Sequence, residues 1–180
     1  MNKAPVIKLP IRFIIWVVRG TPLMLQLLII YYGPGIFLGL NVWGTGGNGR
    51  FIAALVAFVF NYACYFSEIF RGGIQSIPVG QYEAGQVLGM TKSQIFKKVI
   101  LLQVIKRIVP PISNEVITLV KDTSLAFTLA YQEVFSLAKQ ISASQASFMP
   151  FLIAGVFYFV ANYVVERVML RFEKSLDYYK

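Results

Sequence analysis

The chain has 180 residues, of which 57% are hydrophobic and 14% charged, and its formal net charge is +9. Soluble domains are usually about 45–50% apolar and about 25% charged, so this composition argues against an ordinary soluble domain. The absence of histidine excludes histidine-based metal sites and catalytic triads, and the single cysteine, Cys64, excludes an intrachain disulfide.

The apolar residues form long runs that are separated by charged segments, which predicts an all-α, polytopic transmembrane bundle. The first predicted span is Pro10–Gly33, interrupted by Arg19 and Pro22. At 1.5 Å per residue a helix of this length covers roughly 34 Å, enough for a hydrocarbon core of about 30 Å. A glycine-rich loop is predicted over 33–49 and a second span over Phe51–Phe66.

Residues 74–110 mix charged and apolar residues at helical spacing and predict a loop that holds two short amphipathic helices. Pro78 suits the first turn of one helix, since its missing N–H costs nothing there. Gly89 suits the end of that helix. The loop could lie on the lipid surface or could dock a soluble partner, and its small residues favour docking because they allow close approach.

Thr91 and Gln94 predict a capping box at the start of the second short helix. Pro110-Pro111 is predicted to end it. Helical spacing predicts one apolar face, made of Ile95, Val99, Leu102 and Ile105.

Two further spans complete a bundle of four, Ile112–Tyr131 and Pro150–Val165. A polar loop is predicted between them over Gln132–Ser147, and a charged tail over Glu166–Lys180. Fourteen of the 17 Lys and Arg residues fall in the N-terminal segment up to Arg19, within 71–107 or after the fourth span. Because basic residues accumulate on the cytoplasmic side, these three segments are predicted to be cytoplasmic.

Glu115 and Asp122 are unusual because charges are costly inside a span and commonly face a cavity. They are seven residues apart, so they project from the same side of a helix. We predict that they line a pathway and hold the α-amino group or a cationic side chain of an amino acid, with Thr123 and Ser124 adding hydrogen bonds. The alternative is structural: Asp122 pairs with a basic neighbour, and Glu115 is solvated at the mouth of the bundle.

Asn61 and Gln26 are weaker pathway candidates, on the second and first predicted spans. Each is an equally good candidate for a hydrogen bond that joins two helices within the membrane.

Several segments in a fixed order resemble the permease subunits of bacterial ABC importers. Glu83-Ala84-Gly85, Gly89 and Pro110-Pro111 are similar to the "EAA" loop of these permeases. Four further segments resemble the subfamily for polar amino acids, which includes histidine, arginine and glutamine importers. These segments are Arg19–Leu23, Phe66–Ile77, Asn114-Glu115 and Lys121–Leu125.

The resemblance implies a multi-pass permease of the bacterial inner membrane that moves a polar or charged amino acid by alternating access. A cytoplasmic ABC ATPase dimer would grip the loop, a second permease subunit, the same or related, would complete the pathway, and an extracytoplasmic binding protein would deliver the substrate. The residues it assigns to ATPase coupling are Gly80, Glu83, Ala84, Gly85, Leu88 and Gly89. No Gly-x-x-x-x-Gly-Lys-Ser/Thr segment is present, so ATP hydrolysis is assigned to the partner, and no cofactor is expected for this chain.

Three departures from the family pattern stand out. Gly85 replaces the usual third-position alanine, which costs roughly 0.5–1 kcal/mol of helix stability. Leu102 stands where proline is common in the subfamily. Family members typically have five spans, so we expect a further span before Arg19 and favour a truncated sequence over an alternative start or a reduced permease.

Other function classes fit less well. A membrane scaffold that recruits a soluble partner through 74–110 has no use for the intramembrane acids Glu115 and Asp122. An intramembrane aspartyl enzyme lacks a second span that carries a facing acid. Nucleic-acid binding is not expected, because the basic residues follow the side of the membrane and form no single patch.

Overall fold

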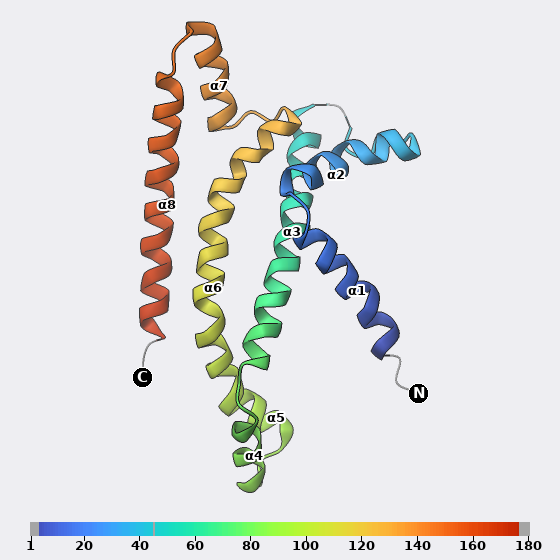
Figure 1. The fold of residues 1–180 in the computed structure, drawn as a ribbon, viewed down its shortest axis with the longest axis vertical. Coiled ribbons are helices and arrows are strands. Elements are labelled where there is room, and N and C mark those ends of the chain that lie inside the picture. Colours follow the sequence, from blue (N-terminus) through green and yellow to red (C-terminus); the bar gives the residue numbers. More distant parts are fainter. Residues whose placement is uncertain (1–3, 45, 177–180) are drawn as a thin grey trace. The chain divides into compact units, whose positions relative to one another are not determined.

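The computed structural model describes residues 4–44 and 46–176, and side chains from Lys8 onward. The chain forms two compact units: unit 1 contains the residues up to Tyr65 together with Val120–Val160, and unit 2 contains Phe66–Leu119 and the residues from Ala161. Every regular element in the described residues is helical (Figure 1). In chain order the helices are α1 (Ala4–Arg19), α2 (Leu23–Leu38), α3 (Gly47–Gln75), α4 (Val79–Val87), α5 (Lys92–Ile95), the π-helical η1 (Phe96–Ile100), α6 (Leu101–Asp122), the 3-10 helix η2 (Thr123–Leu129), α7 (Val134–Gln145) and α8 (Met149–Ser175).

The predicted span Pro10–Gly33 is not one continuous helix. It breaks between α1 and α2, whose axes are bent by 112°. Pro22 precedes α2 with extended backbone (ψ 135°). Proline has no N–H for the helical ladder and disfavours helical geometry in the residue before it, which explains the break at this point. Beyond the break, α2 continues to Leu38, into the segment predicted to be a loop.

Within the described residues, α3 and α8 are long and apolar enough to cross a membrane, and the bent α1–α2 pair is a third candidate if it forms one broken span. The second and fourth predicted spans lie within α3 and α8. Both helices are longer than predicted, with 29 and 27 residues, and most of the predicted charged tail is the last part of α8.

The double proline does not end a helix. Helix α6 begins at Leu101, passes through Pro110-Pro111 and ends at Asp122. Prolines are tolerated within transmembrane helices when other groups satisfy the freed carbonyls. The third predicted span is therefore the later part of α6 followed by η2. Because α6 carries several charged residues, it is not among the helices that qualify as membrane spans by their composition.

The buried face of this region differs from the predicted one. The fully or nearly buried side chains are Ile95, Ile100, Val104 and Ile108, whereas Leu102 is 52% exposed. The spacing from Ile95 to Ile100 is five residues, and the next two spacings are four. The longer spacing arises because η1 is a π-helical turn that inserts one extra residue. A prediction that assumes 3.6 residues per turn throughout therefore assigns the wrong buried face after Ile95.

The predicted polar loop Gln132–Ser147 contains helix α7 instead. Glu133 caps it: its carboxylate accepts hydrogen bonds from the backbone N–H groups of Phe135 and Ser136, and the Ser136 hydroxyl accepts one from the Glu133 N–H. Figure 1 shows α7 followed by the antiparallel start of α8, and ring contacts such as Phe135–Phe151 join the two.

Each unit has its own apolar core. In unit 1, Leu27 of α2 and Leu129 of η2 pack on three small residues of α3, namely Ala53, Ala54 and Ala57. Small residues allow helices to approach closely within a membrane. In unit 2, Ile77 joins the buried isoleucines and valine of the segment from α5 to α6.

Candidate functional site

Helices α4 and α5 form a hairpin at one end of unit 2 (Figure 1). Helix α4 ends in a Schellman motif: the Met90 N–H donates to the Gly85 carbonyl (3.0 Å) and the Gly89 N–H to the Gln86 carbonyl (2.9 Å). Gly89 has a φ of +71°, which glycine adopts without a steric penalty. The prediction that Gly89 ends this helix is confirmed.

The next helix starts as the sequence predicts. Thr91 Oγ1 accepts from the Gln94 N–H (3.3 Å), and Gln94 Oε1 accepts from the Thr91 N–H (2.8 Å). The hairpin is therefore fixed at both sides of its turn by local hydrogen bonds.

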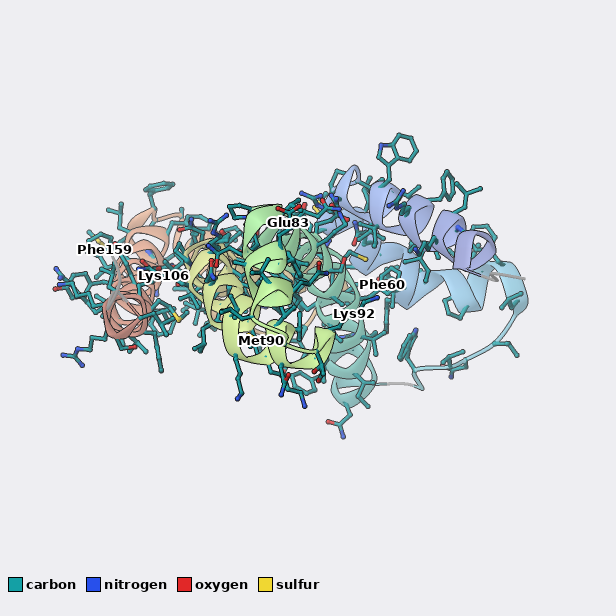
Figure 2. All side chains as sticks on the ribbon, turned by 90° about the horizontal axis from the view of Figure 1, so that it is seen from below. Phe60, Glu83, Met90, Lys92, Lys106 and Phe159 are labelled. Carbon is teal, nitrogen blue, oxygen red and sulfur yellow. The ribbon has the colours of Figure 1, made fainter. Side chains whose placement is uncertain are left out.

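Five of the six residues assigned to coupling are exposed. Gly80, Glu83, Ala84 and Leu88 lie on or just after α4, and Gly89 follows in the turn. Figure 2 looks onto this end of unit 2, with Glu83 labelled at one edge of the hairpin and Met90 at the other. Val87, which the sequence analysis did not include, is 88% exposed, beside Leu88 at 78%. Its position four residues after Glu83 places it on the same face and could have revealed it.

Gly85 lies on the buried face of α4, where it allows close packing. A Cβ at this position would lie 2.6 Å from Ile95 Cγ1, closer than carbon atoms can approach. The glycine that departs from the family pattern thus makes room for Ile95, the buried residue of α5, and joins α4 to the core of unit 2.

Asp122 has a defined partner in unit 1. The Tyr62 hydroxyl of α3 donates to Asp122 Oδ2 at 2.8 Å, so the acid is bound by a phenol. The sequence analysis did not select Tyr62, although it directly follows Asn61 in a predicted span. The hydroxyls of Thr123 and Ser124 donate to the backbone carbonyls of Val120 (2.7 Å) and Lys121 (2.8 Å).

Gln26 and Asn61 form one buried network. Gln26 Nε2 donates to the Val18 carbonyl (2.7 Å) and to the Thr21 carbonyl (3.1 Å) at the break between α1 and α2. Asn61 Nδ2 donates to Gln26 Oε1 (2.9 Å) and ties the break to α3. These contacts support the structural reading of both residues, since they satisfy carbonyls that the break removes from the helical ladder.

Glu115 lies two helical turns before Asp122 along α6 and is half-buried within unit 2. Of the predicted pathway residues, the structure thus joins Asp122 to Tyr62 and Gln26 to Asn61 within unit 1, whereas Glu115 belongs to unit 2.

Comparisons with known proteins identify the relatives of this arrangement. Residues 1–178 match the family described as "Binding-protein-dependent transport system inner membrane component". The octopine transport system permease protein OccM of Rhizobium radiobacter is 39% identical over 172 residues, which cover 93% of this chain and 70% of that protein.

Two further relatives, one compared by sequence and one by structure, match nearly the whole of this chain. The arginine ABC transporter permease protein ArtM of Escherichia coli (strain K12) is 34% identical over 183 residues, covering 96% of this chain and 82% of that protein. The crystal structure of an amino acid ABC transporter with histidines is 33% identical, with a TM-score of 0.83, and the match covers 97% of this chain and 79% of that one.

Proposed function

Because the chain belongs to the family of binding-protein-dependent transport system inner membrane components, we propose that it forms half of a membrane pathway for a polar amino acid and is driven through the α4–α5 hairpin. The chain is the permease component of an amino-acid ABC importer and is not itself an ATPase. The relatives carry octopine, arginine or histidine in their names, which supports a polar or cationic amino acid as substrate.

The proposed partners follow from what this chain lacks and what it exposes. A cytoplasmic ATPase dimer supplies ATP hydrolysis, a second permease subunit completes the pathway, and an extracytoplasmic binding protein delivers the amino acid. The bundle is proposed to cross the inner membrane through the α1–α2 pair, α3, the later part of α6 with η2, and α8. The hairpin and the end of α8 are cytoplasmic in this arrangement, in accordance with their basic residues.

The observation that carries the coupling proposal is the contrast between the two faces of α4. Its inner face is fixed by Gly85 against Ile95, and its outer face presents one carboxylate, Glu83, beside exposed Val87 and Leu88. Exposed apolar side chains next to a charge are typical of a docking surface. A rigid helix of this kind transmits movement, because the partner cannot shift α4 without shifting the core of unit 2.

The substrate path is proposed to pass Asp122 in unit 1. A carboxylate within a span is costly and commonly faces a pathway or a cavity, and the hydrogen bond from Tyr62 leaves Asp122 Oδ1 able to accept from an ammonium group. Thr123 and Ser124 follow it on η2, and Glu115 precedes it on α6. Gln26 and Asn61 are proposed to shape the path by fixing the α1–α2 break.

The experiment replaces the charge on the hairpin. Glu83→Lys in the assembled importer, reconstituted with its binding protein, should lower ATP-dependent uptake by about tenfold, equivalent to 1.4 kcal/mol of lost interaction. The amount of permease inserted should stay unchanged. Ser93→Lys is the matched control, since it adds a positive charge at an exposed position of α5 and should leave uptake near wild type. Equal uptake by wild type and Glu83→Lys would refute docking at α4.

A further inference from the structure

Unit 1 contains a hollow of about 770 Å³ where α3 begins, η2 ends and α7 packs. Ligand sites in proteins usually measure about 300–1,000 Å³, so this one can hold a small organic molecule. Two basic residues, Arg50 and Lys139, line it. The other lining residues are Gly47, Phe127, Ala130, Tyr131, Gln132, Ser136, Gln140 and Ala143.

The two basic residues of this hollow have no acidic partner. No acidic residue lines it, and neither Arg50 nor Lys139 forms an ion pair in the part of the chain that the structure describes. The neighbouring acid, Glu133, is committed elsewhere: its carboxylate caps α7 and accepts from the Tyr158 hydroxyl at 3.0 Å. Two cations in one hollow repel each other, and a bound anion relieves that repulsion.

Arg50 is only partly satisfied. Its Nη1 donates to the Ala130 carbonyl (3.1 Å), which anchors the guanidinium to the end of η2. Its Nε is buried and has no hydrogen-bond partner within the described residues. Lys139 Nζ lies 5.3 Å from the centre of the Phe127 ring, a cation–π contact that holds the ammonium in place without neutralising it.

We propose that this hollow binds a small carboxylate, namely the carboxylate group of the amino acid that enters the pathway; this inference rests on the proposed function. A guanidinium recognises a carboxylate through paired N–H donors, and an ammonium adds a second charge. Gln132, Ser136 and Gln140 offer further hydrogen bonds within the same hollow. With no acid in the lining, the site recognises the anionic end of the substrate and not its ammonium group.

The hollow and Asp122 are then successive sites. Asp122 precedes the seven-residue 3-10 helix η2, and the hollow lies at its other end. At about 2.0 Å per residue η2 is roughly 14 Å long. The ammonium and carboxylate of an amino acid are attached to one carbon, so one molecule cannot occupy both sites at once. We place the carboxylate site first on the path, because Arg50 and Lys139 lie at the ends of the predicted spans opposite to the three segments predicted to be cytoplasmic.

The first test measures the charge preference of the hollow in the complete importer. Ala143→Cys in a Cys64→Ala background provides one reactive thiol in the hollow without removing a hydrogen-bonding side chain, and Gly47→Cys is the second position if the first does not assemble. An anionic methanethiosulfonate should react faster than a cationic one of similar size. Adding Lys139→Gln should lower that ratio several-fold, whereas Lys139→Arg should preserve it. Arg171→Gln, on the exposed side of α8, is the matched control and should change nothing.

The second test identifies the ligand by protection of the same thiol in detergent without added lipid. L-arginine should slow the reaction, and agmatine, the same molecule without its carboxylate, should not. Equal protection by both, no protection by either, or protection only by anionic phosphatidylglycerol would overturn the carboxylate assignment, the last by identifying a lipid headgroup as the occupant. ATP-dependent uptake is measured on the same preparation. Normal uptake together with no preference of the hollow for carboxylate refutes this inference alone. Absence of uptake and of any associated ATPase refutes the proposed function.

Discussion

Gly85 shows how one missing side chain fixes the position of a whole helix. Ile95 fills the space where a Cβ would stand, and Ile95 itself is 2% exposed. The cost of glycine within α4 is therefore compensated by close packing against α5. Sequence comparison could mark Gly85 as unusual, but only the three-dimensional contact explains it.

We expect Gly85→Ala to destabilise the hairpin by about 1–3 kcal/mol, the usual cost of forcing an extra carbon into a packed site. Limited proteolysis of the detergent-solubilised importer should detect faster cleavage between Val79 and Ile95. The double variant Gly85→Ala/Ile95→Ala relieves the clash, so its cost should be less than the sum of the two single variants. Gly80→Ala is the control, since a Cβ there meets no atom within 4 Å. Additive costs would show that the contact does not hold the hairpin.

Asp122 and Tyr62 allow the pathway hypothesis to be separated from a purely structural role. Asp122→Asn removes the charge, so the KM for uptake of arginine, histidine and glutamine should rise by about tenfold or more, since a charge-assisted hydrogen bond is lost. Tyr62→Phe keeps the charge of Asp122 and removes only the hydroxyl that donates to it, so its effect should be smaller. Unchanged uptake of all three amino acids by Asp122→Asn would remove it from the pathway.

At the scale of elements, the π-helical turn η1 sets the register of everything that follows it. It offsets Ile95 from the face formed by Ile100, Val104 and Ile108 by one extra residue. Deleting exposed Lys98 should convert the turn into regular α-helix while keeping the four buried residues on one face.

The Lys98 deletion should therefore melt within about 4 °C of the parent importer, equivalent to about 1 kcal/mol. Deleting Leu102, which is exposed but lies after the turn, rotates the buried face by about 100° and should lower the melting temperature much further. Circular dichroism and thermal melting in detergent distinguish the two deletions. If both deletions behaved alike, the extra residue of η1 would not determine the register.

Elements with local signals were predictable from the sequence. The Thr91–Gln94 capping box, the terminating Gly89 and the apolar runs within α3 and α8 were all confirmed. Elements that depend on tertiary packing were not. Pro110-Pro111 failed to stop α6, and α7 is capped by Glu133, an uncommon capping residue. Of the site, the exposed hairpin residues followed from the motif, whereas Tyr62 and the basic hollow required the fold.

At the scale of the whole molecule, the surface is suited to lipid and to partner subunits. Helix α8 qualifies as a membrane span, and only 6% of its most apolar 18-residue stretch is buried within the chain. Its strongly exposed apolar side chains include Leu152, Ile153, Val156, Phe157 and Phe159. A helix with this much exposed apolar surface is stable in a bilayer or when packed against another helix. In water, such a surface causes aggregation.

The measurement that tests coupling most directly places one cysteine at Glu83 in a Cys64→Ala background and reads both its side of the membrane and its neighbour. An impermeant maleimide should label Glu83→Cys in inverted vesicles and not in spheroplasts, while Asn48→Cys should show the reverse. A short bifunctional maleimide should join Glu83→Cys to an ATP-hydrolysing subunit. Labelling of Glu83→Cys from outside, or an adduct that never contains an ATPase, would contradict the proposed docking of α4.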